Sequence, residues 1–269
     1  MSAGTMDATT IAALGREIYE AERAAAPVQP LSARHPELDP AAAYAVQEAY
    51  ARLRVASGAR LIGRKIGCTS AAIQTLFGID TPDYGQLFDD MLIADGGEVS
   101  SDALVAPMVE PELTFLLHAD LVGPGVTVDD VLAATRSVLP SLEVIDSRIE
   151  EWRIQFVDTV ADNGSSARCV FGQAIPIDEL EARGIDLATE RVRLYCDGTE
   201  LFTGTGSDVL GHPCAAVAWL ANALAAYGRR LRAGDFVMSG SMTSAAPARR
   251  GQTYEARFAN FGTVSCRFG

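Results

Sequence analysis

The sequence predicts an α+β protein in which a helical N-terminal part precedes a larger β-rich domain. Apolar residues at helical spacing, bounded by capping residues, dominate the first part. Short runs of β-branched and aromatic residues dominate the rest, and one pair of runs encloses a hairpin turn. Strands and helices do not alternate regularly, and no segment repeats with a period of roughly 20–50 residues. A parallel βαβ sheet and a repeat array are therefore not expected.

The N-terminal segment, residues 1–58, is predicted to contain two helices that cap the rest of the chain. The first helix covers residues 9–25, where isoleucine and leucine side chains fall roughly on one face. A proline-bearing linker follows it. The second helix begins at Asp39-Pro40, an N-cap residue followed by a first-turn proline, and it runs to Gly58.

The second segment, residues 59–269, is predicted to be the β-rich domain. Asp197-Gly198 is the expected hairpin turn within RVRLYCDGTELFTG. A helix begins at Pro213 and ends at Gly228. Further strands are expected at 60–67, 109–117, 141–147 and 168–175 and on either side of 260–262, with another helix at 128–138.

The chain is strongly acidic. It contains 35 Asp and Glu residues against 22 Lys and Arg residues, which gives a formal net charge of −13. Such a chain repels nucleic acid and anionic membranes, so neither is an expected partner. An anionic substrate is compatible with this charge only where a metal ion or a placed cation reverses the local field.

The cysteine pattern and the N-terminus predict a cytoplasmic protein. The five cysteines are odd in number and show no CxxC spacing. This favours free thiols in a reducing compartment over disulfides or a cysteine zinc site. The N-terminus has no signal-peptide pattern, and no apolar run reaches the roughly 18 residues that a membrane span requires.

Lys65, within GRKIGCTS, is the only lysine among the 22 basic residues. Lysine is a compact charge whose pKa shifts readily, whereas arginine stays protonated. In a strand, Gly63 and Gly67 would share the face of Lys65 and leave room for a ligand. Lys65 is therefore a candidate catalytic or anion-binding group, and a lysine retained by chance is the alternative.

Glu110 and Glu112 share one face of the strand predicted for VEPELTFLL. Positions two apart in a strand lie about 6.5–7 Å from each other, so both carboxylates could reach one cation. Pro111 between them indicates an edge strand or a bulge. Taken alone, such a pair more often forms a solvated strand face.

Glu143 stands inside the apolar run PSLEVID, which predicts a buried carboxylate. Buried charges are paired or bind metal. Three carboxylates and some water molecules suit Mg²⁺ or Mn²⁺ better than Zn²⁺. The alternative is an ion pair between Glu143 and a nearby arginine such as Arg148.

The segment GIDTPDYG, residues 78–85, is predicted to be a turn-rich loop that carries Asp80 and Asp83. Asp83 is a candidate general acid or base, or a group that orients water. Both aspartates could equally be ordinary turn residues that accept hydrogen bonds from their own backbone.

Five segments in series resemble the 2-keto-4-pentenoate hydratase / 4-oxalocrotonate decarboxylase family, which belongs to the fumarylacetoacetate hydrolase superfamily. They are GRKIGCTS, GIDTPDYGQLFDDM, VEPELTFLL, SLEVIDSRIEEWRIQFVDTVADN and VLGHP. The resemblance extends from about residue 42 to residue 268. It implies a mixed β-roll of the fumarylacetoacetate hydrolase C-terminal domain type with an N-terminal helical part, usually assembled as a homo-oligomer.

The resemblance also implies roles for individual residues. Glu110, Glu112 and Glu143 match the carboxylates that bind Mg²⁺ or Mn²⁺ in the family. Lys65 matches the active-site lysine, and Asp83 matches an acidic residue of the hydratase branch. Ser166, in ADNGSS, matches a serine that lines the pocket.

The chemistry that the resemblance implies is the hydration of 2-hydroxypenta-2,4-dienoate in meta-cleavage degradation of aromatic compounds. The product would be 4-hydroxy-2-oxopentanoate. The carboxylate and the 2-oxygen of the substrate would bind the metal, which acts as a Lewis acid. Lys65 would add positive charge or move a proton, and Asp83 would assist proton transfer or water addition at C4.

The sequence carries features that resemble both branches of the family. Asp83 is typical of the hydratases. Arg168, in SSAR, and the segment GSMTSAAPA are closer to the decarboxylases. An arginine can hold a second carboxylate bidentately, so Arg168 favours a dicarboxylate substrate and the alternative function, a 4-oxalocrotonate-type decarboxylase.

Two further functions are alternatives to hydration and decarboxylation. An acylpyruvate hydrolase of the same superfamily would need a His/Glu pair that activates water, and His35 with Glu37 is the only such pair near the N-terminal helices. A non-catalytic partner subunit of a homologous enzyme is the alternative of another class, since family members are thought to associate with pathway enzymes. The complete set of three glutamates and one lysine argues against an inactive subunit.

Overall fold

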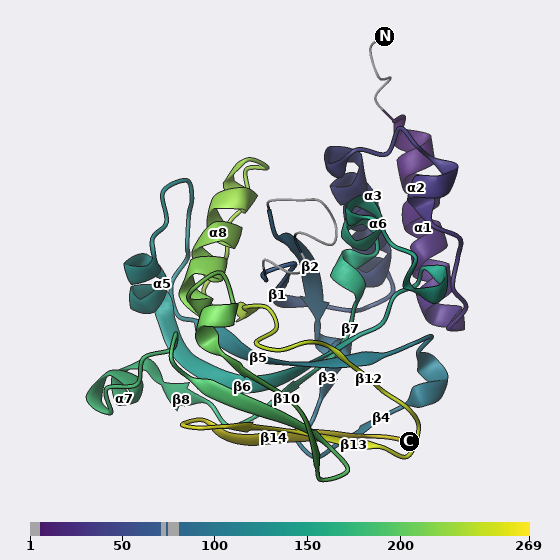
Figure 1. Ribbon diagram of the computed structural model, residues 1–269. Coiled ribbons are helices and arrows are strands. Elements are labelled where there is room, and N and C mark those ends of the chain that lie inside the picture. The colour runs from purple at the N-terminus through teal and green to yellow at the C-terminus, as the bar shows by residue number, and fades with distance from the viewer. Residues whose placement is uncertain (1–5, 71–73, 75–80) are drawn as a thin grey trace.

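The computed structural model describes residues 6–70, 74 and 81–269. Most of the helices lie on one side of a curved sheet, and a second, smaller sheet lies on its other side (Figure 1). The N-terminal helices are α1 (Ala8–Ala24), α2 (Leu31–Arg34) and α3 (Pro40–Ala56). The later helices are α5 (Val128–Ala134), α6 (Phe156–Ala161), α7 (Ile177–Ala182) and α8 (Pro213–Ala225).

Helix α3 begins at the cap that the sequence predicts, whereas α1 begins at Ala8, one residue before the predicted start, with Asp7 as its cap. Asp7 accepts hydrogen bonds from the first-turn N–H groups of α1, and Asp39 does so for α3, where Pro40 occupies the first turn. Helices α1 and α3 lie side by side (Figure 1). The sequence prediction of two helices before residue 58 is confirmed, with the short α2 added between them.

The larger sheet carries the functional residues. Its strands follow the order β2-β1-β11-β5-β6-β7-β3, with β12 also paired to β5 and β8 to β6. The bounds are β1 (Leu61–Gly67), β2 (Asp83–Phe88), β3 (Leu92–Ile93), β5 (Met108–Leu117), β6 (Thr135–Ile145), β7 (Ser166–Phe171), β8 (Ile175–Pro176), β11 (Phe236–Met238) and β12 (Ala246–Pro247). Strands β5 and β6 are the longest and form an antiparallel pair at its centre.

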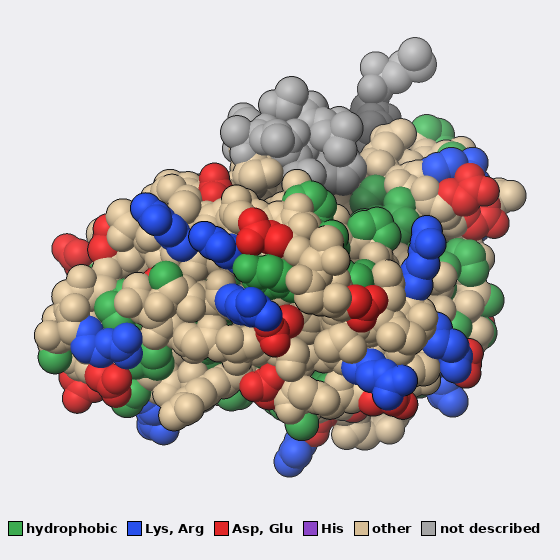
Figure 2. Space-filling view, turned by 60° about the horizontal axis from the view of Figure 1, so that its bottom comes forward, with side chains coloured by type: hydrophobic (Ala, Val, Ile, Leu, Met, Phe, Trp, Pro, Cys, Tyr) green, Lys and Arg blue, Asp and Glu red, His purple; other side chains and the backbone are tan. Residues whose placement is uncertain are grey.

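The smaller sheet has the strand order β10-β9-β13-β14-β4. The bounds are β4 (Glu98–Val99), β9 (Arg191–Cys196), β10 (Thr199–Thr205), β13 (Thr253–Phe258) and β14 (Gly262–Phe268). Asp197 and Gly198 both have positive φ, 50° and 80°, and turn the chain from β9 into β10 as the sequence predicts. On the face in Figure 2, acidic and basic side chains are interspersed, so the net negative charge is not gathered there.

Two apolar clusters hold the layers together. The first contains Val109, Leu113 and Phe115 of β5, and packs them against the smaller sheet and α8. The second joins the N-terminal helices to β2 and β7. Side chains on both sides of the proposed boundary between residues 58 and 59 share this second cluster, so the N-terminal segment is packed onto the β-rich part.

The predicted helix at 128–138 is wrong at its C-terminal end. Helix α5 ends at Ala134, and β6 begins at Thr135. Pro140 disfavours a helical conformation in the residue before it. The ladder with β5 also satisfies the main-chain groups of this segment, so pairing overrides the local helical pattern.

Pro111 is not on an edge strand, contrary to the expectation. It lies in central strand β5, opposite Leu142 of β6. On its other side, β12 pairs with β5 only at Met108 and Val109, and β11 pairs only from Thr114 onward. A proline is tolerated in this gap because no ladder partner needs its missing N–H.

None of the helices in the described part of the chain combines the length and the apolar character that crossing a bilayer requires.

Candidate metal and substrate site

Three glutamates from two adjacent strands converge at the centre of the larger sheet. Glu110 of β5 is the direct register partner of Glu143 of β6, and Glu112 lies two residues along β5 on the same face. One carboxylate oxygen from each glutamate lies within 4.8 Å of the others. Glu112 and Glu143 are completely buried, and Glu110 is partly exposed. The solvated strand face that such a pair often forms is therefore excluded here.

The carboxylate oxygens of this cluster lack enough donors within the described structure. Glu112 Oε2 accepts a hydrogen bond from the Gly240 N–H at 2.9 Å, but Glu112 Oε1 and Glu143 Oε1 have no partner, and Glu143 Oε2 has only the Lys65 ammonium, at 3.1 Å. Buried carboxylates without donors are unfavourable unless a cation binds them. An all-oxygen set of this kind fits a hard divalent cation.

Burial and mutual repulsion shift the protonation of these groups. Burial raises the pKa of Glu110 to about 7. Burial, and then the charges of Glu143 and Glu110, hold the pKa of Glu112 well above its usual range. The three carboxylates therefore resist ionising together in the protein alone, and a divalent cation would relieve the repulsion among them.

Lys65 of β1 is the cation nearest to this cluster. Its Nζ lies 3.1 Å from Glu143 Oε2, and its side chain is 4% exposed. Burial lowers the pKa of Lys65, but the charges of Glu143, Asp83 and the other two glutamates more than offset burial and hold it above the ordinary value. One ammonium thus stands among four carboxylates, so the surrounding charge remains negative.

The alternative partner of Glu143, Arg148, is engaged elsewhere. Arg148 Nε forms a buried ion pair with Asp162 Oδ1 at 2.6 Å. Glu143 instead faces Lys65 and the other two glutamates.

The glycines around Lys65 make room for the chain itself. A Cβ on Gly63 would clash with the main chain of Phe236, and a Cβ on Gly67 would clash with the Asp83 carboxylate. A Cβ on Gly164 would lie 3.2 Å from Lys65 Cε. The expectation that Gly63 leaves space for a ligand is therefore wrong, because Gly63 permits close approach of β11. Gly67 permits close approach of Asp83 and also lines the cavity described below.

Asp83 is the first residue of β2 and pairs in register with Gly67. The turn-rich loop predicted for residues 78–85 thus gives way to a strand at Asp83, whereas Asp80 lies outside the described residues. Asp83 is buried, and its Oδ2 accepts a hydrogen bond from Thr159 at 3.2 Å. Burial raises the pKa of Asp83, although Lys65 and the Thr159 hydroxyl oppose this rise.

A strained turn that the sequence reasoning missed holds Lys65 from the other side. Asn163, Gly164 and Ser165 all have positive φ, at 57°, 62° and 53°. The Asn163 amide accepts a hydrogen bond from the Gln86 N–H at 2.7 Å and donates one to the Gln86 carbonyl at 2.9 Å. This clamp fixes the turn against β2 and the stem of Lys65. The Asn-Gly pair in ADNGSS was the available signal, because both residues tolerate this conformation.

A cavity of about 740 Å³ opens onto this cluster. Lys65, Asp83 and Glu110 line it, whereas Glu112 and Glu143 are fully buried and do not line it. Its volume is in the range of small-molecule sites. Further lining residues are Ile66, Gly67, Cys68, Thr69, Ser70, Met108, Ile145, Trp152, Ile154, Thr159, Gly164, Ser165, Thr203, Asp208 and residues 241–245.

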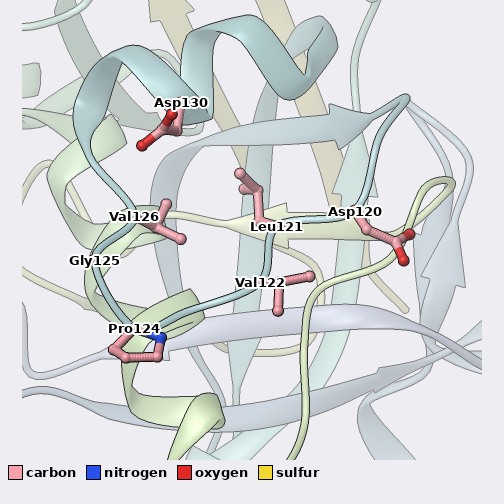
Figure 3. Close-up of a pocket in the computed structure, with 7 residues that line it drawn as sticks. All are labelled: Asp120, Leu121, Val122, Pro124, Gly125, Val126 and Asp130. Atoms are coloured by element: carbon pink, nitrogen blue, oxygen red, sulfur yellow. The ribbon is translucent and has the colours of Figure 1, made fainter.

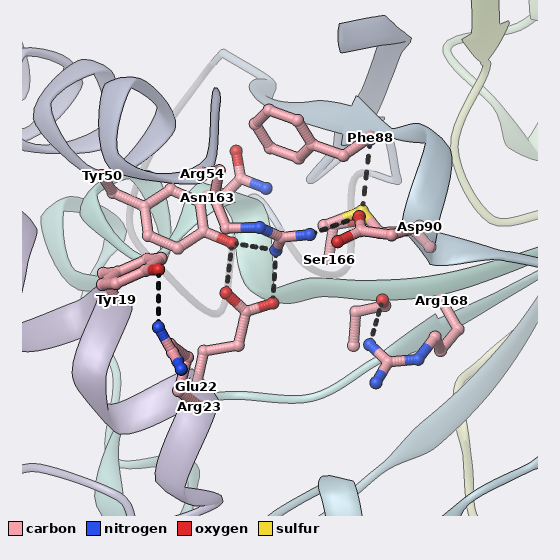
Figure 4. A network of polar contacts seen from close by, with 12 residues as sticks. Tyr19, Glu22, Arg23, Tyr50, Arg54, Phe88, Asp90, Asn163, Ser166 and Arg168 are labelled. Atoms are coloured by element: carbon pink, nitrogen blue, oxygen red, sulfur yellow. Dashed lines mark hydrogen bonds and ion pairs between the residues drawn. The ribbon is translucent and has the colours of Figure 1, made fainter. Parts of the chain in front are cut away.

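The other two predicted site residues, Ser166 and Arg168, do not line the cavity. Ser166 is buried with its Oγ unpartnered, beside the cavity-lining Ser165, and does not itself line the cavity. Arg168 is adjacent in β7 to Cys169, the register partner of Glu143, and therefore points to the opposite face of the sheet. Its guanidinium donates to the Ala167 carbonyl, apart from the neighbouring polar network (Figure 4). The structure gives Arg168 no contact with the cavity.

The His35 and Glu37 pair also lies outside the cavity lining. Its two side chains are 3.2 Å apart at the end of α2, and both are partly exposed. The structure thus provides no support for a water-activating pair at the site, and the hydrolase alternative loses its only candidate residues.

A second hollow lies at residues 120–130 and carries two aspartates (Figure 3). Asp120 pairs with Arg230 at 2.9 Å, and Asp130 accepts hydrogen bonds from Thr127 in a capping box. Both carboxylates are therefore used by the fold, and this hollow is not a metal centre.

Comparison with known proteins finds relatives that are named as hydratases of unsaturated 2-hydroxy or 2-oxo acids. It is 43% identical over 256 residues to a 2-hydroxyhexa-2,4-dienoate hydratase from Comamonas testosteroni, covering 94% of this chain and 96% of the relative. It is 40% identical to a 2-oxo-hept-4-ene-1,7-dioate hydratase from Escherichia coli, covering 97% and 99% of the two chains.

A solved structure has the same fold over nearly the whole chain. It is a 4-oxalocrotonate decarboxylase from Pseudomonas putida G7 complexed with magnesium and adipate. The TM-score is 0.95 at 37% sequence identity, and the match covers 98% of this chain and 99% of that one. The family model for the fumarylacetoacetate (FAA) hydrolase C-terminal region matches residues 78–268. These matches agree with the site geometry, and the chain belongs to the fumarylacetoacetate hydrolase C-terminal family.

Proposed function

We propose that this protein is a metal-dependent hydratase that adds water to 2-hydroxypenta-2,4-dienoate or a close analogue in meta-cleavage degradation of aromatic compounds. The product is the corresponding 4-hydroxy-2-oxo acid. One observation carries the proposal: three glutamates, two of them buried, converge with one buried lysine and one buried aspartate where a cavity reaches the sheet. Relatives named as hydratases support it.

Glu110, Glu112 and Glu143 would hold the metal, which we propose to be Mg²⁺ or Mn²⁺. The fit rests on the unpartnered oxygens of Glu112 and Glu143 and on the all-oxygen donor set. When bound, such a cation would polarise the 2-oxo group of the substrate and offset negative charge there. It would also let an acidic protein bind an anion.

Lys65 would position positive charge beside the 2-oxygen of the substrate. Its ammonium is held charged by the carboxylates and cannot swing away, because Gly164 and Gly85 pack against its stem. A fixed charge in a site with little water stabilises developing negative charge without reorganisation. A guanidinium is broader than an ammonium, so an arginine at this position would collide with the residues packed around the stem. This would explain why a chain otherwise rich in arginine has a lysine here.

Asp83 would hold or move a proton near C4 of the substrate. It lines the cavity on the same sheet face as Lys65, and its raised pKa brings its titration closer to neutrality. Ser166 lies next to the cavity-lining Ser165 but does not line the cavity, so it is given no direct contact with the substrate. Arg168 is left out of the proposed site because it points to the opposite face.

The second candidate function is decarboxylation of a 4-oxalocrotonate-type 2-oxo acid. The match to a solved decarboxylase favours it. The two reactions share the metal and Lys65, so the geometry of these groups does not separate them. The presence of Asp83 in the cavity, and the absence of Arg168 from it, favour hydration. A non-catalytic partner subunit is the least favoured alternative, because the glutamates and Lys65 are all in place.

The protein is further proposed to be a cytoplasmic homo-oligomer that associates with enzymes of the same pathway. All five cysteines are free, which supports a reducing compartment.

The test is the reaction itself. Purified protein would be given 2-hydroxypenta-2,4-dienoate with Mg²⁺ or Mn²⁺, and a parallel sample would contain EDTA. Loss of diene absorbance that depends on metal, with a product heavier by one water, is the expected result. Release of CO₂ from 4-oxalocrotonate without hydration of the dienoate would move the assignment to the decarboxylase. Inactivity on both compounds would bring the partner-subunit alternative forward.

A further inference from the structure

Trp152 is held against the cavity by an unfavourable backbone conformation. Glu151 and Trp152 have φ of 56° and 54°, a left-handed conformation that non-glycine residues rarely adopt in succession. The Trp152 indole N–H donates to the carbonyl of Ala106 at 2.9 Å, which ties the ring to a distant part of the chain. Strain of this kind is most often retained where it positions a functional side chain.

Trp152 is one of several apolar residues that line the cavity. We call this the apolar wall, and it consists of Met108, Ile145, Trp152, Ile154 and Met242, which all line the cavity. Within the wall, Met108 of β5 and Ile145 of β6 are register partners, each two residues from Glu110 or Glu143, so this part of the wall adjoins the glutamate cluster. Its surface offers contacts to hydrocarbon and no acceptor or donor for a charged group, apart from the indole N–H that Ala106 already occupies.

The cavity contains a single cation among the residues that the structure describes, namely Lys65. Asp208 also lines it and is negatively charged, with Oδ2 accepting hydrogen bonds from the Thr205 N–H and hydroxyl. Residues 71–80 contain neither lysine nor arginine in the sequence. A second carboxylate on the substrate would therefore enter the cavity without a partner cation, which is unfavourable.

We infer that the apolar wall receives an uncharged hydrocarbon tail on the far end of the substrate, with Trp152 as the main specificity-determining residue. The inference rests on the proposed function, because the head of the substrate, a 2-oxo acid or its enol, is placed at the metal and Lys65. The protein thus selects monocarboxylic substrates with an alkyl or alkenyl tail over the corresponding dicarboxylates.

Binding of unreactive analogues tests this inference separately from turnover. Titration calorimetry with Mn²⁺-loaded protein would compare 2-oxohexanoate with 2-oxoadipate, which differ in the charge at the far end. We expect 2-oxohexanoate to bind at least tenfold more tightly. Equal or tighter binding of 2-oxoadipate would overturn the inference and leave the proposed function standing. Failure of both acids to bind, with Mn²⁺ still bound, would overturn the proposed function and the inference with it.

Two variants locate the effect. In Trp152→Ala, the advantage of 2-oxohexanoate over pyruvate should fall about tenfold, while pyruvate affinity stays unchanged. Equal weakening of both acids would contradict a role in tail selection. In Ile154→Arg, a cation is added to the wall, and the preference should shift toward 2-oxoadipate; no shift would also count against the inference.

Fluorescence gives a separate test of contact. Because the chain has two tryptophans, Trp219→Phe leaves Trp152 as the only indole. Its fluorescence should change with 2-oxohexanoate, and an unchanged signal would argue against contact.

Discussion

Two buried clusters of charge lie close together in this molecule, and they differ in how completely their charges are satisfied. Around Arg148, Nε pairs with Asp162, and the other guanidinium nitrogens donate to three main-chain carbonyls. Asp162 Oδ2 in turn accepts from the Arg148 N–H and from two serine hydroxyls. Around Lys65, one ammonium faces four carboxylates, several of whose oxygens have no donor.

The difference shows how burial alone fails to identify a functional site. Both clusters contain residues that are almost completely buried, and burial shifts pKa values in both. A balanced cluster, such as Arg148 with Asp162, needs nothing from outside and fixes the chain. A cluster with excess negative charge is stable only with protons or an added cation, so the imbalance points to the ligand.

A third cluster follows the balanced pattern. Arg54 donates to Tyr50, Glu22 and Asp90, and Tyr50 also donates to Glu22, so the network in Figure 4 links α1 and α3 to the edge of the larger sheet. It lies in the part of the molecule that holds the N-terminal helices, and its second carboxylate, Asp90, is 57% exposed, so water solvates the charge that Arg54 does not neutralise.

The largest effect is expected from Glu143→Gln, which removes a proposed metal ligand. Turnover should fall about 10⁴-fold, or about 5 kcal/mol in the activation barrier. The unfolding free energy of the metal-free protein should not fall, because one of the repelling carboxylates is gone. Enzyme kinetics and urea titration in EDTA measure the two quantities. Glu179→Gln, at an exposed position of α7, is the matched control. Near-normal turnover in Glu143→Gln would remove Glu143 from the metal centre.

Arg148→Met should produce the opposite pattern. It leaves Asp162 without its partner and three carbonyls without donors, so we expect a loss of about 3–5 kcal/mol in unfolding free energy. The exposed pair of Arg183 and Glu179 gives the control, since Arg183→Met should cost less than about 1 kcal/mol. Similar losses in both variants, measured by urea unfolding, would mean that the buried cluster does not stabilise the fold.

Lys65→Ala should lower kcat about 10²-fold, or about 3 kcal/mol. Metal affinity should not fall, because the variant removes a cation that competes for the same carboxylates. Lys65→Arg should not restore turnover, since the wider group meets Gly85 and Gly164. Kinetics with calorimetric metal titration separates the two effects. Near-full turnover in Lys65→Ala would end the catalytic role proposed for it.

The pH dependence of metal binding sharpens the same comparison. Burial raises the pKa of Glu110 to about 7, so the metal-free site holds a proton there below neutrality. Metal binding must displace it, and the apparent Kd should rise about tenfold per pH unit below pH 7, or about 1.4 kcal/mol. Without metal, the folded state keeps this proton between pH 4.5 and about 7 while the unfolded state loses it. Unfolding free energy should therefore fall as pH rises through this window. A pH-independent Kd would contradict the proposed ligand.

The smallest effect is expected from a matched pair of glycine variants. Gly164 and Gly184 have almost equal φ, 62° and 65°, but only Gly164 packs on Lys65. Both Gly164→Ala and Gly184→Ala should lose about 1 kcal/mol of stability. Only Gly164→Ala should also lower turnover, because the new methyl group presses on the lysine stem. Equal activity of the two variants would show that the turn does not position Lys65.

The residues of the site were easier to predict than the contacts that hold them. The alternation in VEPELTFLL predicts that Glu110 and Glu112 share one face, and Glu143 is identifiable as a charged residue within an apolar run. Their meeting depends on the register of β5 with β6, which no local pattern gives. The position of Arg168 depends on which face of β7 its place in the strand assigns to it. The position of the Asn163 turn depends on long-range hydrogen bonds to Gln86. The helix at 128–138 failed because tertiary pairing overrode its local pattern.

The register between β5 and β6 also has a consequence for assembly. Glu110 and Glu143 face each other only in the observed pairing, and a slip by one residue would turn Glu143 to the opposite side of the sheet. A cation that binds all three glutamates therefore recognises only correctly paired chains. By mass action it would draw the population toward them, so the supply of the proposed metal would also act as a check on the accuracy of folding.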